Sequence, residues 1–152
     1  MKMPKELEMT PQMRSEHMIL IVDDEPHIRR LIQVNLERVG YRTKQACDGQ
    51  QCLDEVSADH PDLILLDWMM PVKDGMTTMG DLQAGPKTKD IPVIFLTAMG
   101  QDKNVFDGWS AGAWAYITKP FNPREVLAFV DRIILGKRNP DIDQPGGEIY
   151  DV

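Results

Sequence analysis

The stretch from Leu63 to Pro71, Leu-Ile-Leu-Leu-Asp-Trp-Met-Met-Pro, places one carboxylate between two apolar runs. Four aliphatic residues precede Asp67 without any alternation of polar and apolar positions. Such a continuous run is typical of a strand that is buried on both faces of a parallel sheet. A carboxylate is costly to bury unless cations or hydrogen-bond donors surround it. We therefore expect Asp67 to lie where this strand leaves the sheet, next to other polar groups.

Similar apolar runs alternate with segments of helical periodicity along the chain. Strands are predicted at residues 18–22, 41–47, 62–66, 91–96 and 114–118, and helices at 27–39, 49–58, 75–84, 102–111 and 123–135. Strands that alternate with helices favour a parallel sheet with right-handed crossovers. We predict an α/β fold: a doubly wound five-stranded parallel sheet in the order 2-1-3-4-5 with five helices, similar to flavodoxin.

The two ends of the chain differ in composition from this region. Residues 1–16 are polar and contain two prolines, so we expect a flexible N-terminal extension with some helical character. Residues 137–152 contain two prolines and a Gly-Gly pair, and we expect a flexible C-terminal tail. One domain is therefore predicted over residues 17–136.

Composition limits the classes of function. The net charge is −7 and no basic patch is visible, so we expect no direct binding to nucleic acid. The apolar runs are too short to span a membrane, and the N-terminus lacks the apolar segment of a secretory signal, which predicts a cytoplasmic protein. Cys47 and Cys52 are expected to be reduced, packed thiols, and the three histidines have no metal-ligand spacing.

Polar residues stand at the carboxyl ends of four predicted strands: Asp23 and Asp24, then Asp67, Thr97 and Lys119. Each alone has an ordinary explanation, such as a helix cap for Asp24. Because parallel strands end at the same edge of a sheet, these side chains are expected to converge. Crowded carboxylates raise each other's pKa, and one lysine offsets only one charge, which favours a Mg²⁺ site. Asp67 can then act as a nucleophile that accepts a phosphoryl group, with Lys119 and Thr97 binding its oxygens.

Four motifs carry a resemblance to a known family. The segments ILIVDDEPHIRRLI, DLILLDWMMPVKDG, IPVIFLTA and GAWAYITKPF resemble, in this order, the receiver domain of bacterial two-component response regulators of the single-domain chemotaxis type. The resemblance covers roughly residues 17–136. It implies that Asp67 is the phosphoacceptor, that Asp24 binds Mg²⁺ directly and Asp23 mainly through water, and that the Met69 backbone carbonyl completes the protein ligands.

The resemblance also implies a switch. Lys119 would pair with the phosphoryl group or with Asp67, and the Lys119–Pro120 bond would be cis. Thr97 would be the switch hydroxyl and Tyr116 the switch aromatic, which turns inward when Thr97 moves toward the phosphate. The surface of residues 102–111, 114–118 and 123–135 would then change for partner binding.

Four positions depart from the family pattern. Val72 follows Pro71 where the family often has glycine, which predicts a stiffer loop, although Gly75 is retained. Trp114 replaces an acidic residue that supports dimers in many transcription-factor receivers, so Trp114 either forms an apolar partner surface or packs on its own helices. Met69 and Met99 flank the expected route of the attacking water, and neither can orient a water or supply a base. A comparatively long-lived phosphoryl group is therefore predicted.

The leading functional hypothesis is a stand-alone phosphoacceptor that receives its phosphoryl group from a histidine kinase or phosphotransfer protein. It would catalyse only its own phosphorylation and dephosphorylation, contact a downstream protein target or relay the phosphate, and be a monomer or a weak phosphorylation-dependent dimer. One alternative is a receiver fragment of a larger DNA-binding transcriptional regulator. A Mg²⁺-dependent phosphohydrolase is disfavoured because Met69 occupies the place of its second aspartate, and a receiver-like scaffold is disfavoured because all motif residues are present.

Overall fold

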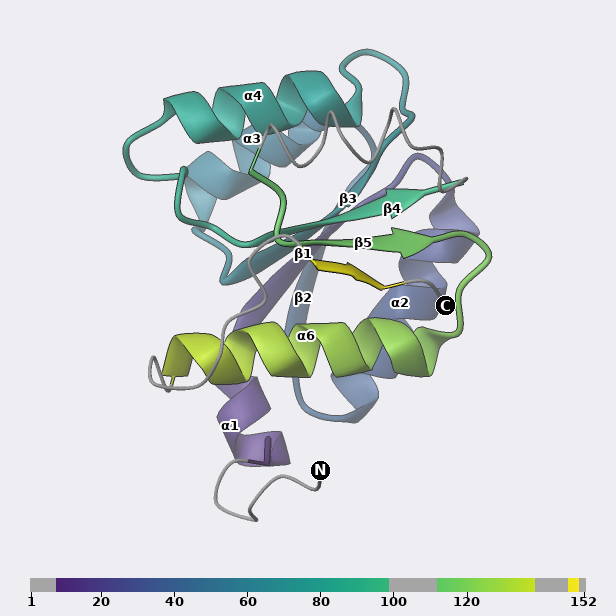
Figure 1. Cartoon of the computed structure of the whole chain (residues 1–152), viewed down its shortest axis with the longest axis vertical. Coiled ribbons are helices and arrows are strands. Elements are labelled where there is room, and N and C mark those ends of the chain that lie inside the picture. The colour runs from purple at the N-terminus through teal and green to yellow at the C-terminus, as the bar shows by residue number, and fades with distance from the viewer. Residues whose placement is uncertain (1–7, 99–111, 139–147, 151–152) are drawn as a thin grey trace.

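The computed structural model describes residues 8–98, 112–138 and 148–150 (Figure 1). The strands are β1 (Met18–Val22), β2 (Arg42–Ala46), β3 (Leu63–Asp67), β4 (Val93–Thr97), β5 (Ala115–Thr118) and β6 (Glu148–Tyr150). The helices are α1 (Pro11–Ser15), α2 (Pro26–Arg38), α3 (Gly49–Ala58), α4 (Gly75–Ala84) and α6 (Pro123–Arg138). All neighbouring strands pair in parallel, in the order β2-β1-β3-β4-β5-β6.

The predicted fold class is confirmed. The five expected strands lie in the order 2-1-3-4-5, and α2, α3, α4 and α6 correspond to four of the five expected helices. The helix predicted at residues 102–111 lies outside the described residues. Helices α3 and α4 cover one face of the sheet, and α2 and α6 cover the other (Figure 1). This arrangement buries the central strands on both sides, as their continuous apolar sequences require.

The core is divided into two layers by the sheet. Within β3, Leu63 and Leu65 belong to the cluster that includes residues of α2 and α6, whereas Ile64 and Leu66 belong to the cluster with α3 and α4. All four side chains are fully buried. Successive side chains of a strand point to opposite faces, so a continuous aliphatic run fills both layers. Strand β3 is therefore a rigid central support for the residue at its end, Asp67.

The described part of the N-terminal segment contains the short helix α1, in keeping with the helical character expected there. Thr10 caps α1 with its side chain, and Arg14 donates two hydrogen bonds to Asp131 of α6, at 3.0 and 2.7 Å. The Tyr41 hydroxyl donates to the same carboxylate at 2.5 Å. Arg14 and Asp131 are 117 positions apart in sequence, which explains why the local composition gave no sign of their contact.

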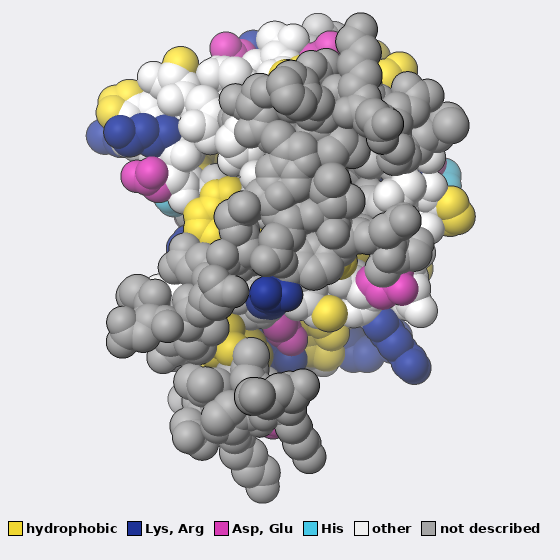
Figure 2. Space-filling model, in the orientation of Figure 1, with side chains coloured by type: hydrophobic (Ala, Val, Ile, Leu, Met, Phe, Trp, Pro, Cys, Tyr) yellow, Lys and Arg dark blue, Asp and Glu magenta, His cyan; other side chains and the backbone are white. Residues whose placement is uncertain are grey.

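Within the C-terminal segment, Glu148–Tyr150 forms the sixth strand of the sheet. Both cysteines are free, as predicted, and Cys52 is buried; the expected packing is wrong for Cys47, whose side chain is exposed. In the described part of the chain, no helix is long and apolar enough to cross a membrane. On the face drawn in Figure 2, basic and acidic side chains of the described residues lie intermixed rather than in one basic surface.

Candidate functional site

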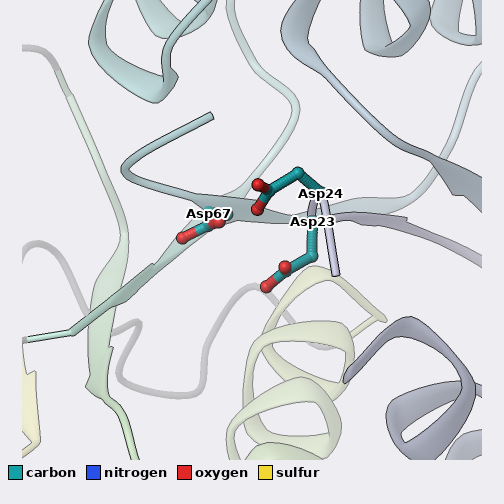
Figure 3. A group of neighbouring side chains, drawn as sticks. All are labelled: Asp23, Asp24 and Asp67. Atoms are coloured by element: carbon teal, nitrogen blue, oxygen red, sulfur yellow. The ribbon is translucent and has the colours of Figure 1, made fainter. Parts of the chain in front are cut away.

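Three carboxylates meet at the carboxyl ends of β1 and β3. Asp23 and Asp24 directly follow β1, and Asp67 is the last residue of β3, so the ends of two neighbouring strands supply all three (Figure 3). One oxygen from each side chain lies within 4.8 Å of the other two. Asp23 and Asp67 are buried and Asp24 is exposed. The predicted convergence of these residues is therefore present.

Lys119 supplies a positive charge to this cluster from the end of β5. Its Nζ donates hydrogen bonds to Asp23 Oδ2 at 2.8 Å and to Asp67 Oδ1 at 3.3 Å. Its backbone N–H donates to the Thr97 carbonyl at 2.6 Å, which ties the segment to the end of β4. The peptide bond between Lys119 and Pro120 is cis, as predicted.

The electrostatics of the cluster are dominated by burial and by repulsion between carboxylates. Burial, together with the charge of Asp23, raises the pKa of Asp67 to about 7, although attraction to Lys119 opposes this change and contact with Asp24 adds to it. Burial alone would lower the pKa of Lys119, but its hydrogen bond to Asp23 and the charges of Asp67 and Asp23 outweigh burial, so its pKa is raised. Lys119 therefore stays protonated at neutral pH and offsets only part of the negative charge.

The loop after Asp67 is held close to the sheet by backbone contacts. The Trp68 N–H donates to the Leu96 carbonyl at 2.9 Å, and the Gly75 N–H donates to the Trp68 carbonyl at 3.0 Å. A Cβ atom on Gly75 would lie 2.5 Å from the Asp67 carbonyl oxygen, so only glycine fits at this start of α4. The helix thus packs directly against the backbone of the candidate nucleophile.

Val72, at the position where the family often has glycine, adopts a φ of 69°. The Lys73 N–H donates to the Pro71 carbonyl at 2.7 Å, which closes a γ-turn centred on Val72. A β-branched residue with a positive φ is a rare, strained conformation. The loop that carries Met69 is therefore fixed by a tight turn, while the Met69 side chain is largely exposed.

The two candidate switch residues lie on neighbouring strands. Thr97 ends β4 and is buried, at the same edge of the sheet as Lys119. Tyr116 lies within β5 and is 2% exposed, so its ring occupies an inward position in this structure. That ring stacks on Phe95 with 5.6 Å between ring centroids and lies 6.4 Å from the Trp68 ring. An aromatic cluster thus connects Tyr116 to the residue that follows Asp67.

The structure also distinguishes the two explanations offered for Trp114. This side chain is half-buried and packs against the core cluster that lies between the sheet and α2 and α6, which favours packing on its own helices. Met99 lies outside the described residues.

Sequence reasoning missed Arg29, whose Nη1 donates to the Asp23 backbone carbonyl at 2.7 Å and whose Nε donates to Gln45 at 3.0 Å. An arginine in the second turn of a helix carries no sequence signal for this positioning role.

Comparison with known proteins agrees with the geometry. The family model for the response regulator receiver domain matches residues 19–131. The phosphate regulon transcriptional regulatory protein PhoB of Pseudomonas aeruginosa is 43% identical over 136 residues, which cover 88% of this chain and 59% of that protein. The DNA-binding dual master transcriptional regulator RpaA of Synechocystis is 44% identical over 116 residues, which cover 76% of this chain and 48% of that protein.

Among solved structures, the chemotaxis response regulator CheY4 of Vibrio cholerae superposes with a TM-score of 0.73 at 29% identity, covering 76% of this chain and 97% of that one. A putative response regulator from Chloroflexus aurantiacus gives a TM-score of 0.74 at 33% identity, covering 79% and 98%. The chain spans about half to three fifths of the length of the two curated relatives named above. The chain belongs to the family of receiver domains found in two-component response regulators.

Proposed function

We propose that Asp67 is the phosphoacceptor of this receiver domain and takes its phosphoryl group from a histidine kinase or a phosphotransfer protein. The observation that carries the proposal is the position of Asp67, at the end of a fully buried strand and 3.3 Å from the Lys119 ammonium. A nucleophile on such a rigid support is held in one orientation, which is the main requirement of phosphoryl transfer.

The residues of the cluster fit a divalent cation. Three carboxylates offer oxygen atoms close together, and one lysine leaves negative charge that is not offset. Oxygen ligands of this kind suit Mg²⁺. We propose that Asp24, Asp67 and the Met69 carbonyl hold Mg²⁺, with Asp23 contributing mainly through water. When bound, Mg²⁺ would supply charge neutralisation for the phosphoryl oxygens.

The protein's own groups account for the remaining chemistry. An ionised Asp67 oxygen attacks the phosphorus atom of the donor, a new O–P bond forms, and the P–N bond to the donor imidazole breaks. Lys119 offsets the charge of the transferred group, and the Thr97 hydroxyl donates to one of its oxygens. Attack by water on the same phosphorus atom later releases phosphate and restores the carboxylate. Both steps are self-catalysed by the receiver domain.

The switch is proposed to run from Thr97 to Tyr116. Movement of Thr97 toward the phosphoryl group alters the space beside Tyr116, whose ring already stacks on Phe95. Because Tyr116 lies on β5, its position affects the surface of β5 and α6; residues 102–111, which the resemblance adds to this surface, lie outside the described residues. We propose that this surface binds the downstream protein target.

A second candidate keeps the same chemistry but changes the output. Both curated relatives named above are transcriptional regulators, and this chain spans only about half to three fifths of their length. The receiver domain would then control a separate DNA-binding domain within a larger regulator. This alternative assigns no DNA contact to the receiver domain itself.

The site can be tested with beryllofluoride, a stable mimic of the phosphoryl group, and tryptophan fluorescence. Trp68 adjoins Asp67, so its emission should change saturably with beryllofluoride only when Mg²⁺ is present. Asp24→Asn should raise the Mg²⁺ concentration needed for the half-maximal fluorescence change by about tenfold or more, because it removes a charged ligand. Asp54→Asn, at an exposed aspartate of α3, is the matched control and should behave as wild type. An unchanged signal in wild type, or equal effects of both substitutions, would contradict the proposal.

A further inference from the structure

The outer edge of β5 is a place where another strand can add to the sheet. Strand β4 pairs with one edge of β5, and in a five-stranded sheet the other edge would present unpaired N–H and C=O groups. In this structure Glu148–Tyr150 pairs with that edge in parallel, with Tyr116 opposite Ile149 (Figure 1). The edge is therefore occupied by the chain's own C-terminal segment.

The length of the connection allows this pairing within one chain. A parallel neighbour requires a crossover of a dozen or more residues, and α6 supplies 16. A helix of that length spans roughly 24 Å, and the nine residues from 139 to 147 can extend to about 30 Å, enough to return beside the start of β5. Helix α6 lies on the face of the sheet opposite to α4, so the crossover from β5 to β6 has the opposite hand to the one from β3 to β4.

The sequence around β6 agrees with a strand that begins at Glu148. Pro145 and the Gly146–Gly147 pair precede it, and these residue types end regular structure. Ile149 and Tyr150 then supply a β-branched and an aromatic residue, the types that favour strands. A three-residue strand is too short to bind strongly as a free peptide, but the tether gives it a high effective concentration.

We propose that the outer edge of β5 is a strand-addition surface and that Glu148–Tyr150 occupies it as an intramolecular latch. An extended segment of another protein can add to this edge only by displacing the latch. The latch lies beside the strand that carries Tyr116 and leads into Lys119, so its displacement exposes backbone groups next to the site. This inference goes beyond the proposed phosphorylation and does not depend on it.

The latch is tested by amide hydrogen exchange of the full chain. Successive N–H groups of a strand alternate in direction, so the double substitution Ile149→Pro/Tyr150→Pro removes a donor that faces β5 whichever residue supplies it. Exchange of the β5 amides that face away from β4 should become about tenfold faster or more. Val152→Pro, beyond the strand, is the matched control and should leave β5 protected. The amides of β1 report whether the remaining sheet is intact and should not change.

Two results would overturn the latch. Equal protection of β5 in wild type and in the double variant would mean that Glu148–Tyr150 does not cover the edge. Protection in wild type that is lost on dilution, together with a dimer in sedimentation, would mean that a second copy supplies the strand. Protection that is independent of concentration and is lost only in the double variant would support the latch, whether or not Asp67 accepts a phosphoryl group.

Discussion

Replacing Asp67 with asparagine is expected to stabilise the folded protein at alkaline pH in the absence of divalent cations. The Asp67 side chain is only 6% exposed and faces the Asp23 carboxylate, with Lys119 as its nearby cation. Burial and the charge of Asp23 together raise the pKa of Asp67 to about 7. Asparagine has nearly the same shape without the charge, so Asp67→Asn removes the repulsion and keeps the packing.

The size and the sign follow from the difference between the folded and unfolded chains. The unfolded carboxyl ionises near its ordinary pKa of 3.8, whereas the folded one ionises near 7. Between these values the folded state binds more protons, so the free energy of unfolding falls as the pH rises through this window and is constant above it. The full difference corresponds to about 4 kcal/mol. Because solvent reaches the cluster at the exposed Asp24, screening should reduce this to about 2 kcal/mol.

The assay is urea unfolding followed by circular dichroism, in the presence of a chelator, at pH 5 and pH 8. The free energy of unfolding of Asp67→Asn should exceed that of wild type by about 2 kcal/mol at pH 8. At pH 5 the difference should be less than half of that, because Asp67 is still mostly protonated in the folded protein and this pH lies only a little above the pKa of the unfolded carboxyl. Asp54→Asn, at an exposed site, should match wild type at both values. A gain that is equal at the two pH values, or a loss of stability at pH 8, would contradict the raised pKa of Asp67.

Three further predictions concern the loop, the N-terminal helix and the lifetime of the phosphoryl group. Val72→Gly should raise the free energy of unfolding by about 1 kcal/mol, because an L-residue in the left-handed region costs roughly 1–2 kcal/mol whereas the extra entropy of glycine costs about 0.5–1 kcal/mol. The Val72 side chain is 83% exposed, so little packing is lost. Val72→Ala should gain less stability, and a net loss of stability in urea unfolding of Val72→Gly would contradict this prediction. Arg14→Ala should lower the free energy of unfolding by about 1–2 kcal/mol through its two hydrogen bonds to Asp131, and a midpoint equal to wild type would show that α1 contributes nothing. After loading with a small phosphodonor, the phosphoryl group on Asp67 should persist for much longer than seconds. Met69→Gln should shorten its lifetime by placing a polar group beside the attacking water. A lifetime of seconds in wild type would contradict the idea that apolar methionine side chains flank the path of that water.

Most of the fold and the positions of the acidic residues could be predicted because they depend on local patterns. Continuous aliphatic runs such as Leu63–Leu66 have few structural solutions other than a strand between two helical layers. Once the strands are parallel, residues at their carboxyl ends must meet, which places Asp23, Asp24 and Lys119 near Asp67. The chemistry of the cluster then follows from the crowding of like charges.

The features that sequence reasoning missed depend on contacts between distant or ordinary residues. Nothing near Arg14 indicates that a carboxylate on α6 will bind it, so the N-terminal segment had the composition of a flexible extension. The pairing of β6 with β5 depends on the length of an intervening helix and linker rather than on a strong strand signal. The strained φ of Val72 could be suspected only by comparison with the glycine that the family often has at this position.

The central claim is that Asp67 accepts one phosphoryl group, and direct labelling tests it most simply. The full chain would be incubated with a small phosphodonor, with and without Mg²⁺, and its intact mass measured alongside Asp67→Ala and the matched control Asp54→Ala. One added phosphoryl group is expected in wild type and in the control, only with Mg²⁺, and none in Asp67→Ala. Labelling that persists in Asp67→Ala, or no labelling of wild type, would contradict the claim.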